Sequence, residues 1–109
     1  MADTHYAGLN ASDSLTVGSG TPITKIAVYA PSITPASVGA ATVVEQTFSV
    51  PGLTTADKVV VNAPALVNAI GVAGVRVSAA DTLAIRFANP TAGALTPAAG
   101  TYPVIAFRS

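Results

Sequence analysis

The sequence predicts an all-β fold, and three observations lead to that prediction. Eight prolines are spread along the 109 residues, and a proline inside a helix costs about 3 kcal/mol, so long helices are not expected despite the abundant alanine. Apolar residues alternate with a period of two instead of 3.6. Six or seven short apolar runs are separated by loops containing Pro and Gly. This pattern is typical of a small jelly-roll-like β-sandwich or barrel.

The chain divides into an N-terminal arm, residues 1–22, and a β domain, residues 23–109. The arm is small, polar and rich in Gly and Ser, and we expect it to be flexible and to become ordered on a partner. A weak strand is expected within it, over SLTVG near residue 15. The β domain is long enough for one modest hydrophobic core.

The first strand of the β domain is expected in ITKIAVYA, residues 23–30. Ile26 and Val28 are two residues apart, so they share one face of this strand. We expect that face to point inward because it is apolar, and Lys25 and Tyr29 to lie on the opposite face.

The next two strands are expected in VVEQTFSV and KVVVN. In the former, Val44, Phe48 and Val50 share one face, and the polar residues between them occupy the other. In the latter, Val59 and Val61 lie together on one face. Both runs are rich in β-branched residues, as expected of half-buried strands.

Residues 75–89 are predicted to form a β-hairpin. Both arms alternate with a period of two, and SAADT between them provides the turn. The large apolar residues that share the inner face are Val75, Val77, Leu83, Ile85 and Phe87.

The last strand is expected in YPVIAFRS. Its period of two aligns Ile105 with Phe107 and leaves Arg108 outside. Pro103 has no backbone N–H to donate, which indicates an edge or a bulge at this position.

Residues 63–74, APALVNAIGVAG, are too apolar for a loop in solvent. We expect them to be buried in an intersubunit contact, with a helical turn around Leu66 to Ile70. An equally good interpretation is a loop folded over one open end of the chain's own barrel.

Charge is scarce throughout the chain. Five basic and five acidic residues make up 9% of the sequence and give a net charge of zero, whereas soluble domains contain about 25% charged residues. Much of the surface is therefore expected to be covered by other protein. The basic residues form no cluster, so nucleic acid is not expected as a partner. The apolar run 59–75 is too short and too interrupted to cross a bilayer, so no membrane association is expected.

Residues that could carry chemistry are few and do not form a catalytic pattern. His5 is the only histidine and lies in the arm, and the chain has no cysteine, so no triad or Cys/His zinc site is expected. Asp57 and Asp81 both occupy turn settings, TTADK and SAADT, in which aspartate bonds its own backbone. We expect neither an enzyme nor a bound cofactor or metal.

Four segments carry a resemblance to a known family: VPGL, KVVVNAP, RVSAADTLAIRFANPTAG and PAAGTYPV. The region that contains them, from Phe48 to Arg108, resembles a module of tailed-bacteriophage virion proteins. That module is found in capsid decoration (cement) proteins and in head- or tail-fibre domains. The resemblance implies a small, jelly-roll-like β domain that works as an oligomer in a virus particle, and it assigns no catalytic residues.

Composition and resemblance together lead to one functional hypothesis and one alternative. The hypothesis is a capsid cement protein, made in the host cytoplasm, that binds the outer surface of the major capsid shell of the virion and stabilises it. The alternative is a head- or tail-fibre domain that binds a host-surface glycan through Tyr29, Tyr102 and nearby polar loops. The expected partners are the major capsid protein and further copies of the chain, with a trimer slightly favoured over a dimer. The residues expected at protein interfaces are Leu9, Leu15, Leu66, Val67, Ile70, Val72, Arg76 and Arg86.

Overall fold

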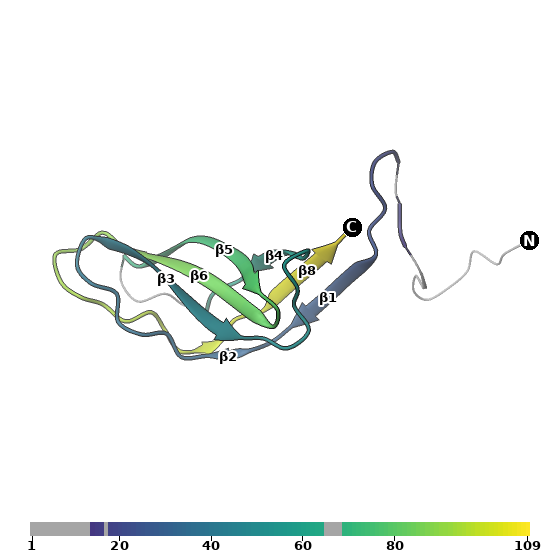
Figure 1. Cartoon of the computed structure of the whole chain (residues 1–109). Helices are drawn as coiled ribbons and strands as arrows, with labels where there is room; N and C mark the ends of the chain where they lie inside the picture. Colours follow the sequence, from purple (N-terminus) through teal and green to yellow (C-terminus); the bar gives the residue numbers. More distant parts are fainter. Residues whose placement is uncertain (1–13, 17, 65–68) are drawn as a thin grey trace, which may run out of the picture.

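Eight β-strands make up the regular structure of the computed structural model, which describes residues 14–16, 18–64 and 69–109 (Figure 1). Every strand pairing in the described part is antiparallel, and none of these residues lies in a helix. It follows that the described residues contain no helix that could span a membrane. The predicted all-β class is confirmed, but none of the sheets closes into a barrel.

The strands form two three-stranded sheets and one short pair. One sheet has the order β3-β6-β5, from Thr42–Ser49, Thr82–Asn89 and Gly71–Ala79. The other has the order β1-β8-β4, from Lys25–Tyr29, Val104–Arg108 and Lys58–Val61. The pair joins β2, Ser32–Ile33, to β7, Gly100–Thr101.

These sheets are parts of a long antiparallel ribbon. The register that pairs Lys25 with Arg108 continues unchanged through the pairing of Ser32 with Thr101 to the bridge between Val38 and Leu95. Four prolines interrupt the hydrogen bonding along this ladder, because proline has no N–H to donate. They are Pro31, Pro35, Pro97 and Pro103. The ribbon then folds back on itself, so that β3 and β6 lie over β2 and β7 (Figure 1).

Asn89 stabilises the place where the ribbon folds back. Its buried side-chain amide donates to the carbonyl oxygens of Val38 (3.0 Å) and Gly93 (2.9 Å). Its side-chain oxygen accepts from the backbone N–H of Thr91 at 3.0 Å. A buried amide is stable only when its hydrogen-bonding groups are satisfied, so these contacts fix Asn89 and the loop around it together.

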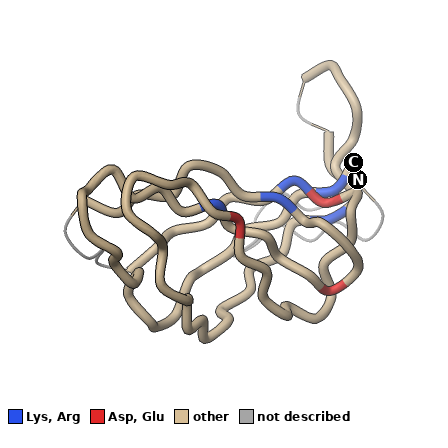
Figure 2. Tube along the Cα trace, turned by 60° about the vertical axis from the view of Figure 1, so that its left-hand side comes forward, with Lys and Arg blue, Asp and Glu red and all other residues tan. Residues whose placement is uncertain are grey.

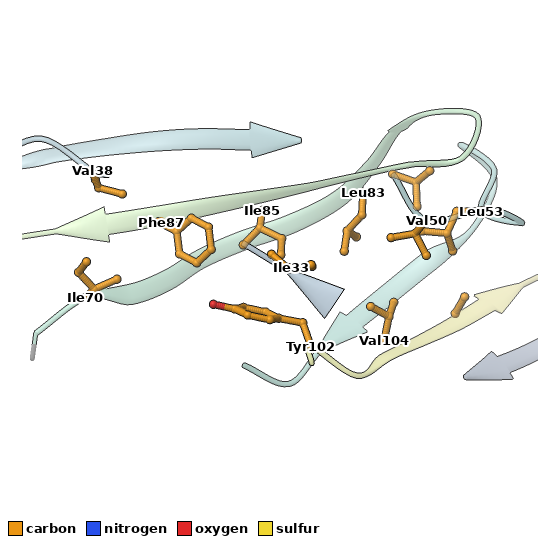
Figure 3. Close-up of a cluster of buried hydrophobic side chains, with 12 residues drawn as sticks. Ile33, Val38, Val50, Leu53, Ile70, Leu83, Ile85, Phe87, Tyr102 and Val104 are labelled. Atoms are coloured by element: carbon orange, nitrogen blue, oxygen red, sulfur yellow. The ribbon is translucent and has the colours of Figure 1, made fainter. Parts of the chain in front are cut away.

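The hydrophobic core lies between the β3-β6-β5 sheet and the strands beneath it. Leu83, Ile85 and Phe87 of β6 point toward Tyr102, Val104 and Ile33 from the opposite layer (Figure 3). This confirms the predicted alternation in the hairpin formed by β5 and β6, whose turn lies at Ala80 and Asp81. The predicted face of residues 58–62 is also correct, because Val59 and Val61 pack against the core. For residues 43–50 the prediction holds for Phe48 and Val50, whereas Val44 is 38% exposed and does not reach the core.

The inward and outward faces of β1 and β8 are the reverse of the prediction. Ile26 and Val28 are exposed and Ile105 is partly exposed, whereas Val104 and Ala106 are buried. The cause is the register of the ribbon: Tyr102 and Val104 enter the core, and period two then turns Ile105 outward.

The same alternation with a period of two places Lys25, Tyr29 and Arg108 on the inner face. The prediction that Arg108 lies outside is therefore wrong. The prediction that Tyr29 lies opposite the core is wrong as well, because Tyr29 packs against it.

Two further expectations have mixed outcomes. The strand expected near residue 15 is reduced to a single bridge between Leu15 and Ile23, in a segment that rises away from the sheets (Figure 1). The helical turn expected around Leu66 to Ile70 lies largely outside the described residues. The end of the apolar segment 63–74 is extended, since β5 begins at Gly71. Ile70 is buried in the chain's own core.

Candidate interaction surfaces

The outer face of the β3-β6-β5 sheet carries two of the predicted interface residues, Arg76 and Arg86. The Arg76 guanidinium donates from Nε to Oε2 of Glu45 (3.0 Å) and from Nη2 to Oε1 (2.8 Å). Glu45 is also the direct cross-strand partner of Arg86, whose Nη2 lies 4.0 Å from Oε2. The hydrogen bond from Arg76 lowers the pKa of the Glu45 carboxyl. Both arginine side chains remain more than half exposed, so they are accessible to a partner.

The other predicted interface residues do not join this surface. Ile70 is only 2% exposed and belongs to the chain's own core, so its side chain is not accessible to a second chain. Val72 is half-buried and packs against the core, as the cross-strand neighbour of Phe87. Leu15 is half-buried at its bridge with Ile23. The remaining three predicted residues, Leu9, Leu66 and Val67, lie outside the described residues.

Two clefts flank Arg76. The larger, about 260 Å³, lies between β4 and β5 and is lined by residues 55, 57–59 and 75–77. The smaller, about 110 Å³, lies over Gly74 and Val75, with the three charged side chains of the outer face around it. Both are smaller than the roughly 300–1,000 Å³ usual for sites that enclose a small molecule. Neither cleft therefore provides a good argument for a ligand site.

A buried carboxylate, Asp57, is the strongest electrostatic feature of the described chain. Arg108 donates to it from Nε (2.7 Å to Oδ1) and from Nη2 (3.1 Å to Oδ2). Lys25 Nζ lies 2.9 Å from Oδ2, and the backbone N–H of Thr54 donates to the same oxygen at 3.0 Å. The hydrogen bonds from Arg108 are the largest of the causes that hold the pKa of Asp57 well below its usual range.

This cluster is built by the sheet register. Lys25 and Arg108 are cross-strand partners at one end of the inner face, and Asp57 immediately precedes β4, whose Lys58 pairs with Phe107. Extending that register by one residue places Asp57 beside Arg108. Figure 2 shows charged residues gathered at this end of the molecule, near the C-terminus. The turn setting correctly predicted a local bond of Asp57 to its own backbone, but not two cationic partners from distant strands.

The loop that precedes Asp57 is bonded to both sheets. Asp81, in the turn between β5 and β6, accepts at Oδ1 from the N–H of Gly52 (2.8 Å), and its own N–H donates to the carbonyl of Leu53 (2.8 Å). The side chain of Asp81 therefore bonds a loop 29 residues earlier in the chain, instead of its own turn as predicted. Lys25 Nζ donates to the carbonyl of Gly52 at 3.1 Å. The two turn aspartates therefore act together: Asp81 holds the start of the loop and Asp57 holds its end.

The outer face of the β1-β8-β4 sheet is apolar and largely exposed. Its two cross-strand rows are Val28–Ile105–Val60 and Ile26–Phe107–Lys58. Exposed fractions are 54% for Ile26, 70% for Val28, 57% for Val60 and 38% for Ile105. This surface was not predicted from the sequence, because the apolar residues of β1 and β8 were expected in the interior. We call these six residues the outer β1-β8-β4 face.

The tyrosines of the glycan-binding alternative are not presented for stacking on a sugar. Tyr102 is fully buried, and its hydroxyl donates to the carbonyl of Ala98 at 2.6 Å. Burial also raises the pKa of this hydroxyl. Tyr29 is half-buried beside Gly52, with Lys25 Nζ 5.2 Å from the centre of its ring. A sugar site made from Tyr29 and Tyr102 together is therefore incompatible with this packing.

Among the described residues, no three His, Cys, Asp or Glu side chains come together to hold a metal ion. The carboxylates of Glu45, Asp57 and Asp81 are each engaged with different partners. No family model, curated protein or solved structure matches this chain.

Proposed function

We propose that this chain is a capsid decoration (cement) protein of a tailed bacteriophage, located on the virion. It would bind the outer surface of the major capsid shell and stabilise it. The proposal joins two independent lines of support, the resemblance of residues 48–108 to phage virion modules and the physical character of the surface. We also propose that the fold is jelly-roll-like. Jelly rolls have two antiparallel sheets packed face to face, and the folded antiparallel ribbon of this chain supports that architecture.

The observation that carries the proposal is the outer β1-β8-β4 face. Isolated exposed apolar side chains are ordinary, but a contiguous apolar sheet face is typical of a protein–protein contact. The outer rows Val28–Ile105–Val60 and Ile26–Phe107–Lys58 contain five apolar residues and one charge. A chain that is only 9% charged is suited to dry contacts with protein, where an unpaired buried charge would be costly.

The mechanism would be accumulation of contact area. A domain of this size offers only small interfaces, but a capsid presents many symmetry-related sites, so linked copies bind with an avidity beyond that of a single contact. The arm, residues 1–22, would become ordered on the capsid or on a neighbouring copy. Arg76 and Arg86 would contribute polar contacts on a separate surface, because each keeps a largely exposed guanidinium on the outer face of the β3-β6-β5 sheet.

The test is co-sedimentation of the purified protein with capsids assembled from the major capsid protein encoded in the same genome. The proposal expects saturable binding at a fixed ratio of chain to capsid subunit and a higher temperature of capsid disruption. Absence of binding to both unexpanded and expanded capsids would refute it. Binding to a glycan array without binding to capsids would favour the fibre-domain alternative, at a site other than Tyr29 and Tyr102.

A further inference from the structure

We propose that the outer β1-β8-β4 face is a homodimer interface, on which the same face of a second copy packs sheet against sheet. The inference concerns the isolated protein, but it uses the same apolar face that supports the capsid function proposed above. It assigns self-association to a surface that includes none of the eight interface residues expected from the sequence. In a dimer the second copy covers this face, so contact with the capsid would be made by the arm and by Arg76 and Arg86.

The distribution of side chains on the β1-β8-β4 sheet is the first argument. An antiparallel sheet with one face on its own core normally carries polar residues on the other face. Here the inner face ends in the charged row of Lys25, Arg108 and Asp57, and five of the six residues on the outer face are apolar. Apart from this charged row the inner face is apolar as well, because Val104 and Ala106 are buried in the core and Val59 packs against it. A sheet that is mostly apolar on both sides is typical of one that is covered on both sides.

The dimensions of the face are the second argument, and they select the occupant. Neighbouring strands lie about 4.8 Å apart, so the two outer strands of this sheet are roughly 10 Å apart, too wide for one extended segment to cover. Residues 1–13 of the arm contain only Met1, Tyr6 and Leu9 as large apolar residues. A second copy offers a face of the same width and composition, and sheets pack in this way at a spacing of about 10 Å.

The area is sufficient for a weak dimer. Taking about 170 Å² for a fully exposed Val or Ile, the exposed fractions of Ile26, Val28, Val60 and Ile105 amount to roughly 350–400 Å². Phe107 and the methylenes of Lys58 add to this. A standard interface buries about 800 Å² on each partner, so the contact falls below that size. We therefore expect a dissociation constant in the micromolar range.

Charge and symmetry agree with a twofold contact. Lys58 is the only charged residue on the outer face, and it lies at one end of the edge strand β4. In such a dimer the twofold axis would lie in the contact plane and pass over Ile105 of the central strand β8. Lys58 of each copy would then lie at the rim of the contact, away from Lys58 of the other copy. An isologous contact of this kind closes at two copies, so the geometry favours a dimer instead of the trimer expected from the sequence.

The experiment is sedimentation equilibrium of the full-length chain from 5 to 500 µM, with no capsid present, for the natural sequence and for Val28→Glu and Val43→Glu. Val28 and Val43 form a matched pair, because both are exposed valines on edge strands but they belong to different sheets, at 70% and 57% exposure. We expect Val28→Glu to raise the dissociation constant at least tenfold and Val43→Glu to change it less than threefold.

Thermal unfolding of each variant checks that the fold is retained, and Val60→Thr, which keeps a β-branched side chain, repeats the test if Val28→Glu does not fold. A natural sequence that remains monomeric at every concentration would overturn the proposal and leave the arm or the capsid as the cover of this face. A dimer that is weakened equally by both valine substitutions, or only by Val43→Glu, would also overturn it. Capsid binding by a monomeric Val28→Glu protein would leave the proposed function standing on its own.

Discussion

Replacement of Asp57 by Asn tests whether the buried ion cluster stabilises the end of the β1-β8-β4 sheet. In the folded chain the carboxylate accepts four hydrogen bonds, from Arg108 Nε and Nη2, Lys25 Nζ and the N–H of Thr54. Asparagine has nearly the same shape, but it is neutral and turns one acceptor into a donor that faces other donors. Two cations at this end of the core then lose their counter-charge.

The cost follows from how well Lys25 and Arg108 can be rehydrated. Removing one partner of a fully buried pair costs about 3–5 kcal/mol. The side chains of Lys25 and Arg108 are 18% and 31% exposed, so water recovers part of this, and we expect a loss of about 2–4 kcal/mol at pH 7. For a domain of this length that is a fall in Tm of roughly 10–20 °C. Thermal and urea unfolding at a concentration where the chain is monomeric would measure it.

The pH dependence gives the same substitution a second readout. Because the pKa of Asp57 is lowered on folding, its contribution is fully present above the unfolded pKa of about 4 and is lost as pH falls toward the folded value. The difference in free energy of unfolding between the natural chain and Asp57→Asn should therefore shrink between about pH 5 and pH 2. A difference that stays constant over this range would refute the electrostatic explanation.

Asp81→Asn is the matched control. Asp81 has a φ of 58°, which asparagine tolerates, and the amide oxygen of asparagine can still accept from the N–H of Gly52. We expect a loss of less than about 1 kcal/mol, because the amide oxygen keeps the bond from Gly52 and the charge that is removed lies at the exposed surface. If Asp57→Asn cost no more than Asp81→Asn, the cluster would have no special role in stability.

Two further substitutions test the packing around the tyrosines. Gly52→Ala should lower the free energy of unfolding, measured by urea denaturation, by about 1–3 kcal/mol. Gly52 has a φ of 101°, which alanine adopts only with strain, and the new methyl would lie 3.0 Å from the Tyr29 hydroxyl. Gly74→Ala is the control, because a methyl at this position would have no atom within 4 Å. It should change the free energy of unfolding by less than about 1 kcal/mol, the usual effect of replacing a strand glycine by alanine. Equal losses for Gly52→Ala and Gly74→Ala would contradict the explanation by close packing. Tyr102→Phe should lower the free energy of unfolding by about 1–2 kcal/mol, because the carbonyl of Ala98 loses its 2.6 Å hydrogen bond. Thermal unfolding measures this loss. An unchanged Tm would show that water replaces the hydroxyl.

The turn and the inward residues of the hairpin formed by β5 and β6 could be predicted from the sequence. The start of β5 at Gly71 and its two register shifts were not predicted. Leu83, Ile85 and Phe87 alternate with small or charged residues, so only one of the two faces could enter the core. The same contrast placed Phe48 inward, on the strand that pairs with β6. In these two strands the more apolar face is also the buried one, so the local pattern oriented them correctly.

In β1 and β8 the local pattern was misleading. Alternation correctly showed that Ile26 and Val28 share one face of β1, and that Ile105 and Phe107 share one face of β8. It does not say which face of each strand is inside. That choice was made by residues far away in the sequence. The ribbon register buries Tyr102 and Val104 beneath β6, and it brings Arg108 over Asp57, 51 residues earlier.

What the sequence by itself determined is the all-β class, the inward face of the hairpin, and the scarcity of charge, which is 9% of the residues. Each of these depends on composition or on neighbours within a few residues. The tertiary structure alone decided that an apolar face would lie outside and a carboxylate with two cations would lie inside. A shift of one residue in strand pairing exchanges the two faces of a sheet, and pairing is fixed by long-range contacts that no local window contains.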